Sequence, residues 1–306
     1  MKYLKELCNV YWARPENAFG IARCMQLLDK MELKSPSLDL MCGHGIWSFI
    51  KAGGDFDYDF DCYQDVIKLE EYKKGADIQN HFSENYKPNI LRKPQYKIDF
   101  GLDWKENNLK KSKALNFYKN LILEDCNNKL SFEDGKFETI FSNTIYWVDD
   151  INNILSELNR ILKNDGKIYL INYLPPMNNY MSFYKKQKFP NSWIDLVDRN
   201  RSVENKHIFT KKEWEQLFAK HGFKIIEYKP THSQLFAHFW NIGLRPLAGY
   251  IISMSKKLSK KEYYELKKKW VNTLFEFFSP YLQSDFFNKI TPGEEVEAIF
   301  VLKKNN

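Results

Sequence analysis

Cysteine is scarce in this sequence and is not grouped. The five cysteines among the 306 residues form no C-x-x-C pair and no cluster with the spacing of metal ligands. This excludes a disulfide framework, and a reducing compartment is expected. The first residues, Met1–Glu6, carry charges and contain no apolar stretch, so we expect no signal peptide. We predict a cytoplasmic protein without a bound metal.

Long apolar runs are also missing. The longest, from Ile242 to Met254, is interrupted by Arg245 and Pro246 and is too short to span a bilayer. The net charge of +7 comes mostly from dispersed lysines. The densest group, Lys256–Lys269, has apolar residues at helical spacing, which is typical of the solvated face of an amphipathic helix. Stable membrane insertion and nucleic-acid binding are therefore not expected, and the oligomeric state stays open.

One short segment carries the strongest functional signal. Ser37–Met41 is predicted as an apolar strand, Cys42–Gly45 as a glycine turn, and Ile46–Ile50 as the start of a helix. Glycine suits such a turn because it tolerates positive φ and lets a ligand approach the backbone. A dinucleotide site has the pattern G-x-G-x-x-G, but Ser48 occupies the third glycine position. A nicotinamide or flavin cofactor is therefore poorly supported.

The rest of the chain alternates between strands and helices. Strands are predicted at residues 96–103, 120–125, 137–142, 167–172, 223–228 and 297–302, and helices at residues 17–33, 105–115, 151–162 and 211–220. This alternation predicts an α/β protein with a Rossmann-like, doubly wound, mostly parallel seven-stranded sheet. Gly166 is expected to end one helix in the left-handed conformation. Thr210 and Glu213 form a capping box for another.

We predict a single domain over residues 1–306 with three insertions. Residues 51–95 follow no regular pattern, and residues 173–208 separate two predicted strands. Residues 231–292, between the last two strands, are expected to form a helical cap over the pocket.

The glycine turn resembles motif I of the class I S-adenosylmethionine-dependent methyltransferases, which is usually written D-x-G-x-G-x-G. Asp39, Gly43 and Gly45 match this motif, and Met41 takes the place of its first glycine. Three later segments, residues 130–143, 155–167 and 209–223, are similar to the type 11 group of these enzymes. The resemblance covers about residues 35–50 and 96–228 and implies S-adenosylmethionine as the cofactor and S-adenosylhomocysteine as its product.

The resemblance also implies a cofactor pocket at the carboxyl edge of the sheet, where an acid after the second strand binds the ribose hydroxyls. Spacing from the glycine turn favours Asp61 for this role, whereas the order of elements favours Asp103, and we predict Asp103. Asp125 would accept from the adenine amine. The predicted cofactor-binding residues are Asp39, Cys42, Gly43, Gly45, Asp103, Trp104, Asp125, Cys126, Ser142 and Asn143.

Methyl transfer from a sulfonium needs alignment and exclusion of water more than covalent help. A hydroxyl acceptor benefits from a general base, usually histidine. We predict His207 as this base because it falls on a loop at the carboxyl edge, and Tyr146 as a second catalytic residue near the methyl group. His232 and His238 follow a predicted strand beside the helical insertion.

The acceptor is expected to be a hydroxyl of a sugar or glycan precursor. The Gly243–Pro246 segment, G-L-R-P, is similar to segments of methyltransferases of surface-glycan biosynthesis. Two alternatives stay open. One is methylation of an aromatic or lipid-like small molecule, to which an apolar cap is suited. The other is a catalytically inactive, cofactor-binding partner protein in which Met41 impairs turnover.

Overall fold

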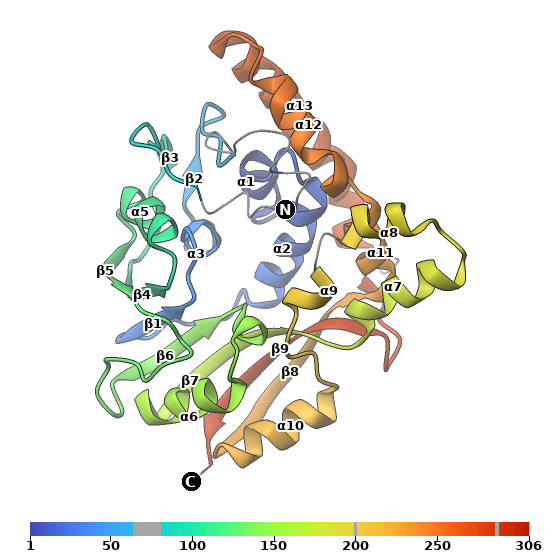
Figure 1. The fold of residues 1–306 in the computed structure, drawn as a ribbon. Coiled ribbons are helices and arrows are strands. Elements are labelled where there is room, and N and C mark those ends of the chain that lie inside the picture. The colour runs from blue at the N-terminus through green and yellow to red at the C-terminus, as the bar shows by residue number, and fades with distance from the viewer. Residues whose placement is uncertain (64–80, 199–200, 285–287, 306) are drawn as a thin grey trace.

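The computed structural model describes residues 1–63, 81–198, 201–284 and 288–305. A sheet of seven strands lies at its centre, in the order β5-β4-β1-β6-β7-β9-β8 (Figure 1). The strands are β1 (Ser37–Leu40), β4 (Ile98–Asp103), β5 (Tyr118–Leu123), β6 (Phe137–Ser142), β7 (Leu162–Tyr173), β8 (Phe223–Ser233) and β9 (Glu295–Lys304). Neighbouring strands of this sheet pair in parallel, except that β9 pairs antiparallel with both β7 and β8. The predicted α/β fold is confirmed.

The direction of the strands decides where functional residues gather. The first five strands of the order run parallel, so their carboxyl ends meet at one edge. Because β7 and β8 both pair antiparallel with β9, β8 also ends at this edge and β9 begins there. The carboxyl edge therefore collects residues from every strand of the sheet.

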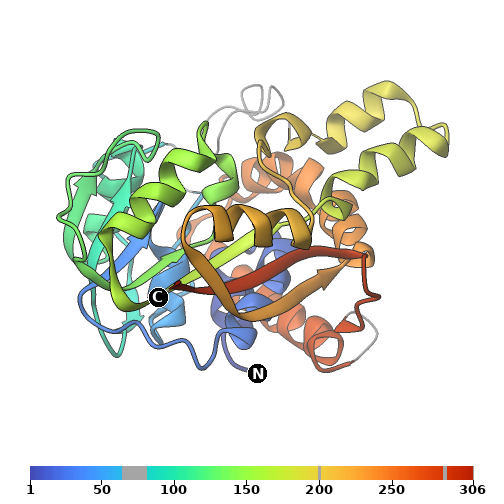
Figure 2. The ribbon, with the colours of Figure 1, turned by 90° about the horizontal axis from the view of Figure 1, so that it is seen from below.

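Apolar side chains alternate between the two faces of the sheet. On β7, Ile168 and Leu170 enter the same core as α6 (Ile151–Ile161) and α10 (Lys211–Lys220). Tyr169 and Ile171 enter the core on the opposite face. Figure 2 shows α6 and α10 together on one side of the strands. The opposite face is covered by α1 (Leu4–Val10), α2 (Pro15–Leu27) and α3 (Ile46–Lys51).

Two helix-end predictions have different outcomes. The capping box of α10 is confirmed, with Thr210 accepting from the backbone of Glu213 and the Glu213 carboxylate accepting in return. The prediction that Gly166 ends a helix in the left-handed conformation is wrong. Strand β7 starts directly after α6, and Gly166 is not among the positive-φ residues described. Glycine is needed here for close packing, since an added Cβ would lie 3.0 Å from the carbonyl oxygen of Glu138 on β6.

The three segments predicted as insertions contain further helices and strands. Residues 51–95 include a small antiparallel pair, β2 (Asp55–Phe56) and β3 (Ile90–Arg92), and residues 64–80 lie outside the described part. After β4 comes α5 (Glu106–Ala114), and after β6 a short 3-10 helix, η1 (Ile145–Trp147). The other inserted helices are α7 (Pro176–Lys186), α8 (Asn191–Asp198), α9 (Arg201–Glu204), α11 (Gln234–Ile242), η2 (Arg245–Leu247), α12 (Ala248–Ser255) and α13 (Lys260–Gln283).

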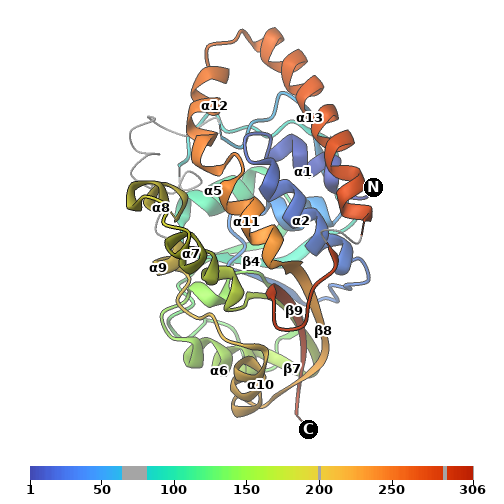
Figure 3. The ribbon, with the colours of Figure 1, turned by 90° about the vertical axis from the view of Figure 1, so that its right-hand side faces the viewer.

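The helices between β8 and β9 have two separate positions. The long α13 lies along α1 and α2, and the indole of Trp270 donates to the carbonyl of Trp12 (Figure 3). The shorter α11 lies beside α2, α7 and the end of β8. The prediction that the lysines of residues 256–269 lie on a solvated helix face is wrong for Lys267. This residue of α13 is buried, and its ammonium group donates to the carbonyl of Phe60. Within the described residues, no helix combines the length and apolar character needed to cross a membrane.

The G-L-R-P segment has a structural role in this fold. Arg245 is 3% exposed, and its guanidinium donates to the carbonyl oxygens of Val197 at 2.7 Å and Asp198 at 3.1 Å. These carbonyls end α8, where backbone acceptors have no partner within the helix. Arg245 therefore ties η2 to α8 and joins two of the insertions.

Candidate active site

The glycine turn after β1 has three residues in left-handed backbone conformations. Gly43 has a φ of +56°, Gly45 of +75°, and Met41 of +59°. An L residue other than glycine is disfavoured there by about 1–2 kcal/mol. Met41 thus adopts the conformation that a glycine would take readily, and its side chain packs against the core beneath the turn.

The two remaining glycines are required for different reasons. A Cβ on Gly45 would lie 2.8 Å from the ring of Tyr118 and 3.1 Å from the hydroxyl of Ser112, so only glycine fits. A Cβ on Gly43 would meet no atom within 4 Å, so the backbone of Gly43 borders open space. Ser112 on α5 donates to the carbonyl of Gly43 and holds the turn in place. The open side of the turn is where a ligand can approach the backbone.

Asp103 at the end of β4 contacts the glycine turn directly. Its Oδ2 accepts from the backbone N–H of Gly43 at 2.9 Å, and its Oδ1 accepts from the backbone N–H of Lys105 at 2.8 Å. Burial raises the pKa of Asp103, although these hydrogen bonds partly offset the effect. Asp61 lies elsewhere, where its Oδ1 accepts from the indole of Trp12 at 3.0 Å. The structure therefore brings Asp103, and not Asp61, to the turn.

Asp39 on β1 lies beneath the turn and contacts protein groups. Its Oδ2 accepts from the hydroxyls of Ser48 and Tyr118, each at 2.6 Å. Burial raises the pKa of Asp39 to about 6, although both hydrogen bonds lower it. Asp39 therefore holds α3 and β5 against β1. Its predicted direct contact with a cofactor stays a prediction.

The other predicted cofactor residues lie at the ends of neighbouring strands. Trp104 follows Asp103 and is 57% exposed. Asp125 follows β5 and is exposed, with its carboxylate accepting from Asn127. The N–H of Cys42 donates to the carbonyl of Leu102, and Cys126 is buried. Ser142 is the last residue of β6, and Asn143 follows it. The topology brings all of them to one edge of the sheet.

His207 and Tyr146, the predicted catalytic residues, lie next to each other. The N–H of His207 donates to the carbonyl of Tyr146 at 3.1 Å. The Nε2 of His207 lies 2.9 Å from the carbonyl oxygen of Val148, which can only accept, so this nitrogen carries a proton. The ring centroid of Tyr146 lies 4.6 Å from that of Tyr173 at the end of β7. Tyr146 thus connects the end of β6 to the region around Tyr173.

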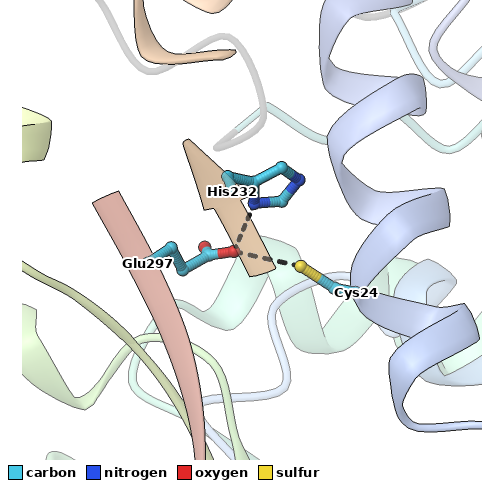
Figure 4. A group of neighbouring side chains, drawn as sticks. All are labelled: Cys24, His232 and Glu297. Carbon is cyan, nitrogen blue, oxygen red and sulfur yellow. Dashed lines mark hydrogen bonds and ion pairs between the residues drawn. The ribbon is translucent and has the colours of Figure 1, made fainter. Parts of the chain in front are cut away.

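Tyr173 lines a cavity of about 60 Å³ at the carboxyl edge. Its lining combines aromatic, apolar and polar side chains, namely Asn17, Cys24, Tyr173, Met177, His232, Phe236, Trp240, Val296 and Glu297, with Gly20. Figure 4 shows that Cys24, His232 and Glu297 meet there from three elements, α2, β8 and β9. Glu297 is paired in register with both Tyr173 and His232.

The carboxylate of Glu297 is the centre of this group. Its Oε2 accepts from Thr231 Oγ1 at 2.7 Å, His232 Nδ1 at 2.9 Å and Cys24 Sγ at 3.0 Å. Burial alone would raise the pKa of Glu297, but the hydrogen bonds from His232, Cys24 and Thr231 hold it below its usual value. Burial raises the pKa of Cys24, so its thiol stays protonated. The sequence analysis did not select this group, because the register of β8 with β9 and the packing of α2 bring its members together.

The sequence matches a methyltransferase domain family over residues 13–228, which is more than half of the chain. The chain belongs to this methyltransferase domain family. It is an S-adenosylmethionine-dependent methyltransferase, as the resemblance of the glycine turn implied. No match was found among curated proteins.

Three solved structures are similar to this methyltransferase over most of its length. A SAM-dependent methyltransferase from Thermotoga maritima, a possible histamine N-methyltransferase, is 16% identical with a TM-score of 0.42, covering 72% of this chain and 76% of that chain. The YcgJ protein from Bacillus subtilis is 12% identical, with a TM-score of 0.43. The match covers 94% of this chain and 99% of that chain. A TehB-like SAM-dependent methyltransferase from Corynebacterium glutamicum is 10% identical, with a TM-score of 0.43. The match covers 94% of this chain and 88% of that chain.

The residues at the glycine turn of this methyltransferase fit an adenosine cofactor. The backbone of Gly43 borders open space, so a ligand can approach it. Asp103 lies next to that backbone and presents a carboxylate that can accept from ribose hydroxyls. Trp104 adds an exposed aromatic surface beside it. When bound, S-adenosylmethionine supplies a methyl group that is already activated on a positively charged sulfur.

Proposed function

We propose that this methyltransferase transfers the methyl group of S-adenosylmethionine to a hydroxyl of a sugar, a glycan precursor or a similar small molecule. The observation that carries the proposal is the cavity beside Tyr173, which adjoins the end of β6 through Tyr146. In this fold the cofactor and the acceptor are expected to meet there. Gly43, Asp103, Trp104, Asp125 and the backbone of Cys126 would hold the cofactor.

The lining of the cavity supports a hydroxyl acceptor. His232, Glu297 and Asn17 offer hydrogen-bonding groups, whereas Phe236 and Trp240 offer aromatic faces. A volume of about 60 Å³ has room for a few water molecules. The cavity therefore accommodates the reacting group of an acceptor, such as a hydroxyl and its carbon, while the rest of the molecule extends outside it.

A second candidate is an aromatic or lipid-like alcohol. Five of the ten lining residues (Tyr173, Met177, Phe236, Trp240 and Val296) carry apolar or aromatic side chains. Such a lining lowers the free energy of an apolar acceptor by removing its surface from water. We propose small molecules, and not nucleic acid, as the acceptors in either case, because Asn143–Tyr146 lacks the Asn/Asp-Pro-Pro-Tyr motif of base methyltransferases.

Calorimetric titration of S-adenosylmethionine and S-adenosylhomocysteine tests the cofactor site. We expect micromolar binding by the wild type and binding at least about tenfold weaker by Asp103→Asn, because a hydrogen bond to a charged group contributes about 1.5–3 kcal/mol. Asp61→Asn is the matched control and should retain the affinity. An affinity that Asp61→Asn loses and Asp103→Asn retains would contradict the assignment, and a wild type that binds neither ligand would contradict the function.

The acceptor class is tested with tritiated S-adenosylmethionine. Sugar nucleotides and methyl α-D-glucopyranoside represent the sugar hydroxyl, and catechol and long-chain alcohols represent the second candidate. Methyl transfer to the sugar compounds supports the proposal. Transfer only to catechol or to the alcohols replaces it with the second candidate.

A further inference from the structure

His232 has one ring nitrogen that is hydrogen-bonded and one that is not. The residue is 4% exposed, and its Nδ1 lies 2.9 Å from the Oε2 of Glu297. Within the described part of the chain, its Nε2 is buried and has no hydrogen-bond partner. The side chain lines the cavity beside Tyr173. Burying a polar atom without a partner is unfavourable, so this nitrogen needs an explanation.

The carboxylate of Glu297 decides which nitrogen carries the proton. An ionised carboxylate only accepts hydrogen bonds, so Nδ1 of His232 must donate. In the neutral ring the proton is then on Nδ1, and Nε2 has a free lone pair. The ring of Phe236 stacks on His232 with a centroid distance of 3.9 Å and an interplanar angle of 24°, which fixes the plane of the imidazole. His232 is therefore oriented by two neighbours and can accept a proton at the cavity.

We propose that His232, held by Glu297, is the general base that removes the proton from the acceptor hydroxyl. This inference rests on the proposed function, since it needs a hydroxyl acceptor. As the acceptor oxygen forms its bond to the methyl carbon, the carbon–sulfur bond breaks and its electron pair stays on sulfur. The hydroxyl proton passes to Nε2 of His232, and Glu297 stabilises the resulting imidazolium until the proton leaves to water.

The same three side chains could also suggest a metal site, because their ligand atoms lie within 4.8 Å of one another. Their geometry favours hydrogen bonding instead. The Sγ of Cys24 lies 3.0 Å and the Nδ1 of His232 2.9 Å from the same oxygen of Glu297, which are the distances of direct hydrogen bonds. In a zinc site the ligands surround the ion at about 2.0–2.3 Å, and cysteine binds as the thiolate. Here the buried Cys24 keeps its proton.

His207 is less suited to the same role. Its Nε2 is already used as a donor to the carbonyl of Val148, and it does not line the cavity. The titratable groups that face His232 are Cys24 from α2 and Glu297 from β9, and Tyr173 from β7 lines the same cavity. Glu297 is the one among them that bonds to Nδ1 of His232.

Nuclear magnetic resonance of the histidine-labelled, full-length chain with S-adenosylhomocysteine bound tests the first step. Long-range proton–nitrogen correlation shows which ring nitrogen of each histidine carries a proton, and His232→Asn assigns the signal. We expect the proton of the neutral His232 ring on Nδ1 and none on Nε2, because Nδ1 donates to Glu297. A proton on Nε2 of neutral His232, or an imidazolium that persists at alkaline pH, would overturn the proposal.

Kinetics with methyl α-D-glucopyranoside and catechol as acceptor probes test the second step. His232→Asn keeps a donor toward Glu297 and removes the base, so kcat should fall by about 10²–10⁴-fold. KM for the probe and the affinity for S-adenosylhomocysteine should change little. Glu297→Gln should also lower kcat, because a neutral amide stabilises the imidazolium less than a carboxylate does. The matched control is His238→Asn on α11, whose ring bonds to Tyr184 and which should keep the wild-type rate.

Each remaining outcome has a defined meaning. A wild type that methylates neither probe contradicts the proposed function, whereas the nuclear magnetic resonance result still decides the state of His232. An active wild type and an equally active His232→Asn contradict the base alone. If His232→Asn no longer binds S-adenosylhomocysteine, His232→Gln replaces it. Tight one-to-one binding of Zn²⁺ that Cys24→Ser abolishes would replace the base with a metal site.

Discussion

Replacing Met41 by glycine and, separately, by alanine tests the unusual backbone of the glycine turn. Met41 has a φ of +59°, where an L residue is about 1–2 kcal/mol less favourable than glycine. Glycine at an ordinary position is about 0.5–1 kcal/mol less favourable than alanine, because it gains more freedom on unfolding. Both variants lose the same methionine packing, so this loss largely cancels. We expect Met41→Gly to be more stable than Met41→Ala by about 1 kcal/mol.

Urea denaturation of the two variants under identical conditions measures this difference. Met31 provides a matched pair, because it is also buried and its φ is not among the positive values of the described non-glycine residues. There the order should reverse, with Met31→Gly less stable than Met31→Ala by up to about 1 kcal/mol. If Met41→Ala equals or exceeds Met41→Gly while the Met31 pair behaves as expected, residue 41 is not left-handed and the reasoning fails.

The same variants show whether Met41 impairs the enzyme. Its side chain packs against the core, away from the open side of Gly43. We therefore expect Met41→Gly to bind S-adenosylhomocysteine within about threefold of the wild type, a difference below 1 kcal/mol. An affinity that improves by about tenfold or more would show that Met41 crowds the cofactor site.

Three further predictions concern stability. Gly45→Ala should lower the free energy of unfolding by about 2–4 kcal/mol in urea, because it combines a left-handed alanine with a contact of 2.8 Å to Tyr118, and an unchanged midpoint would contradict the turn geometry. Asp39 has a folded pKa of about 6 against 3.8 unfolded, so its contribution is fully present below pH 4 and is lost as the pH rises through 6. Asp39→Asn should therefore remove up to about 3 kcal/mol of the pH dependence measured between pH 4 and 7, and identical profiles would refute this. Arg245→Lys should lower the free energy of unfolding by about 2–3 kcal/mol, because lysine cannot bond to both carbonyls that end α8, and a change within about 0.5 kcal/mol would contradict the role of Arg245.

Local patterns in the sequence were sufficient for the fold and the family. The glycine turn, the capping box of α10 and the alternation of strands and helices depend on residues close together in the chain. Such features follow from backbone preferences and apolar periodicity, which act over a few residues. Gly166 shows the limit of this reasoning. Its glycine is explained by contact with Glu138 on the neighbouring strand, and a helix-stop rule cannot see that contact.

The candidate catalytic group could not be predicted in the same way. Cys24, His232 and Glu297 are 273 positions apart from first to last, and each is unremarkable in its own segment. Sequence reasoning considered His232 but favoured His207, because both fall near the carboxyl edge and only hydrogen-bond partners separate them. The choice between Asp61 and Asp103 also depended on tertiary structure. The pairing of β4 with β1 brings Asp103 to the glycine turn.

The sequence by itself determined the class of this protein: a doubly wound α/β methyltransferase with its cofactor turn after the first strand. Those properties are encoded in short segments, because turn conformation and helix capping are local. The tertiary structure decided which side chains share the carboxyl edge, including the pairing of His232 with Glu297 and the cavity that they line. The register between β8 and β9 and the packing of α2 against them are long-range interactions, and they exist only in the folded chain.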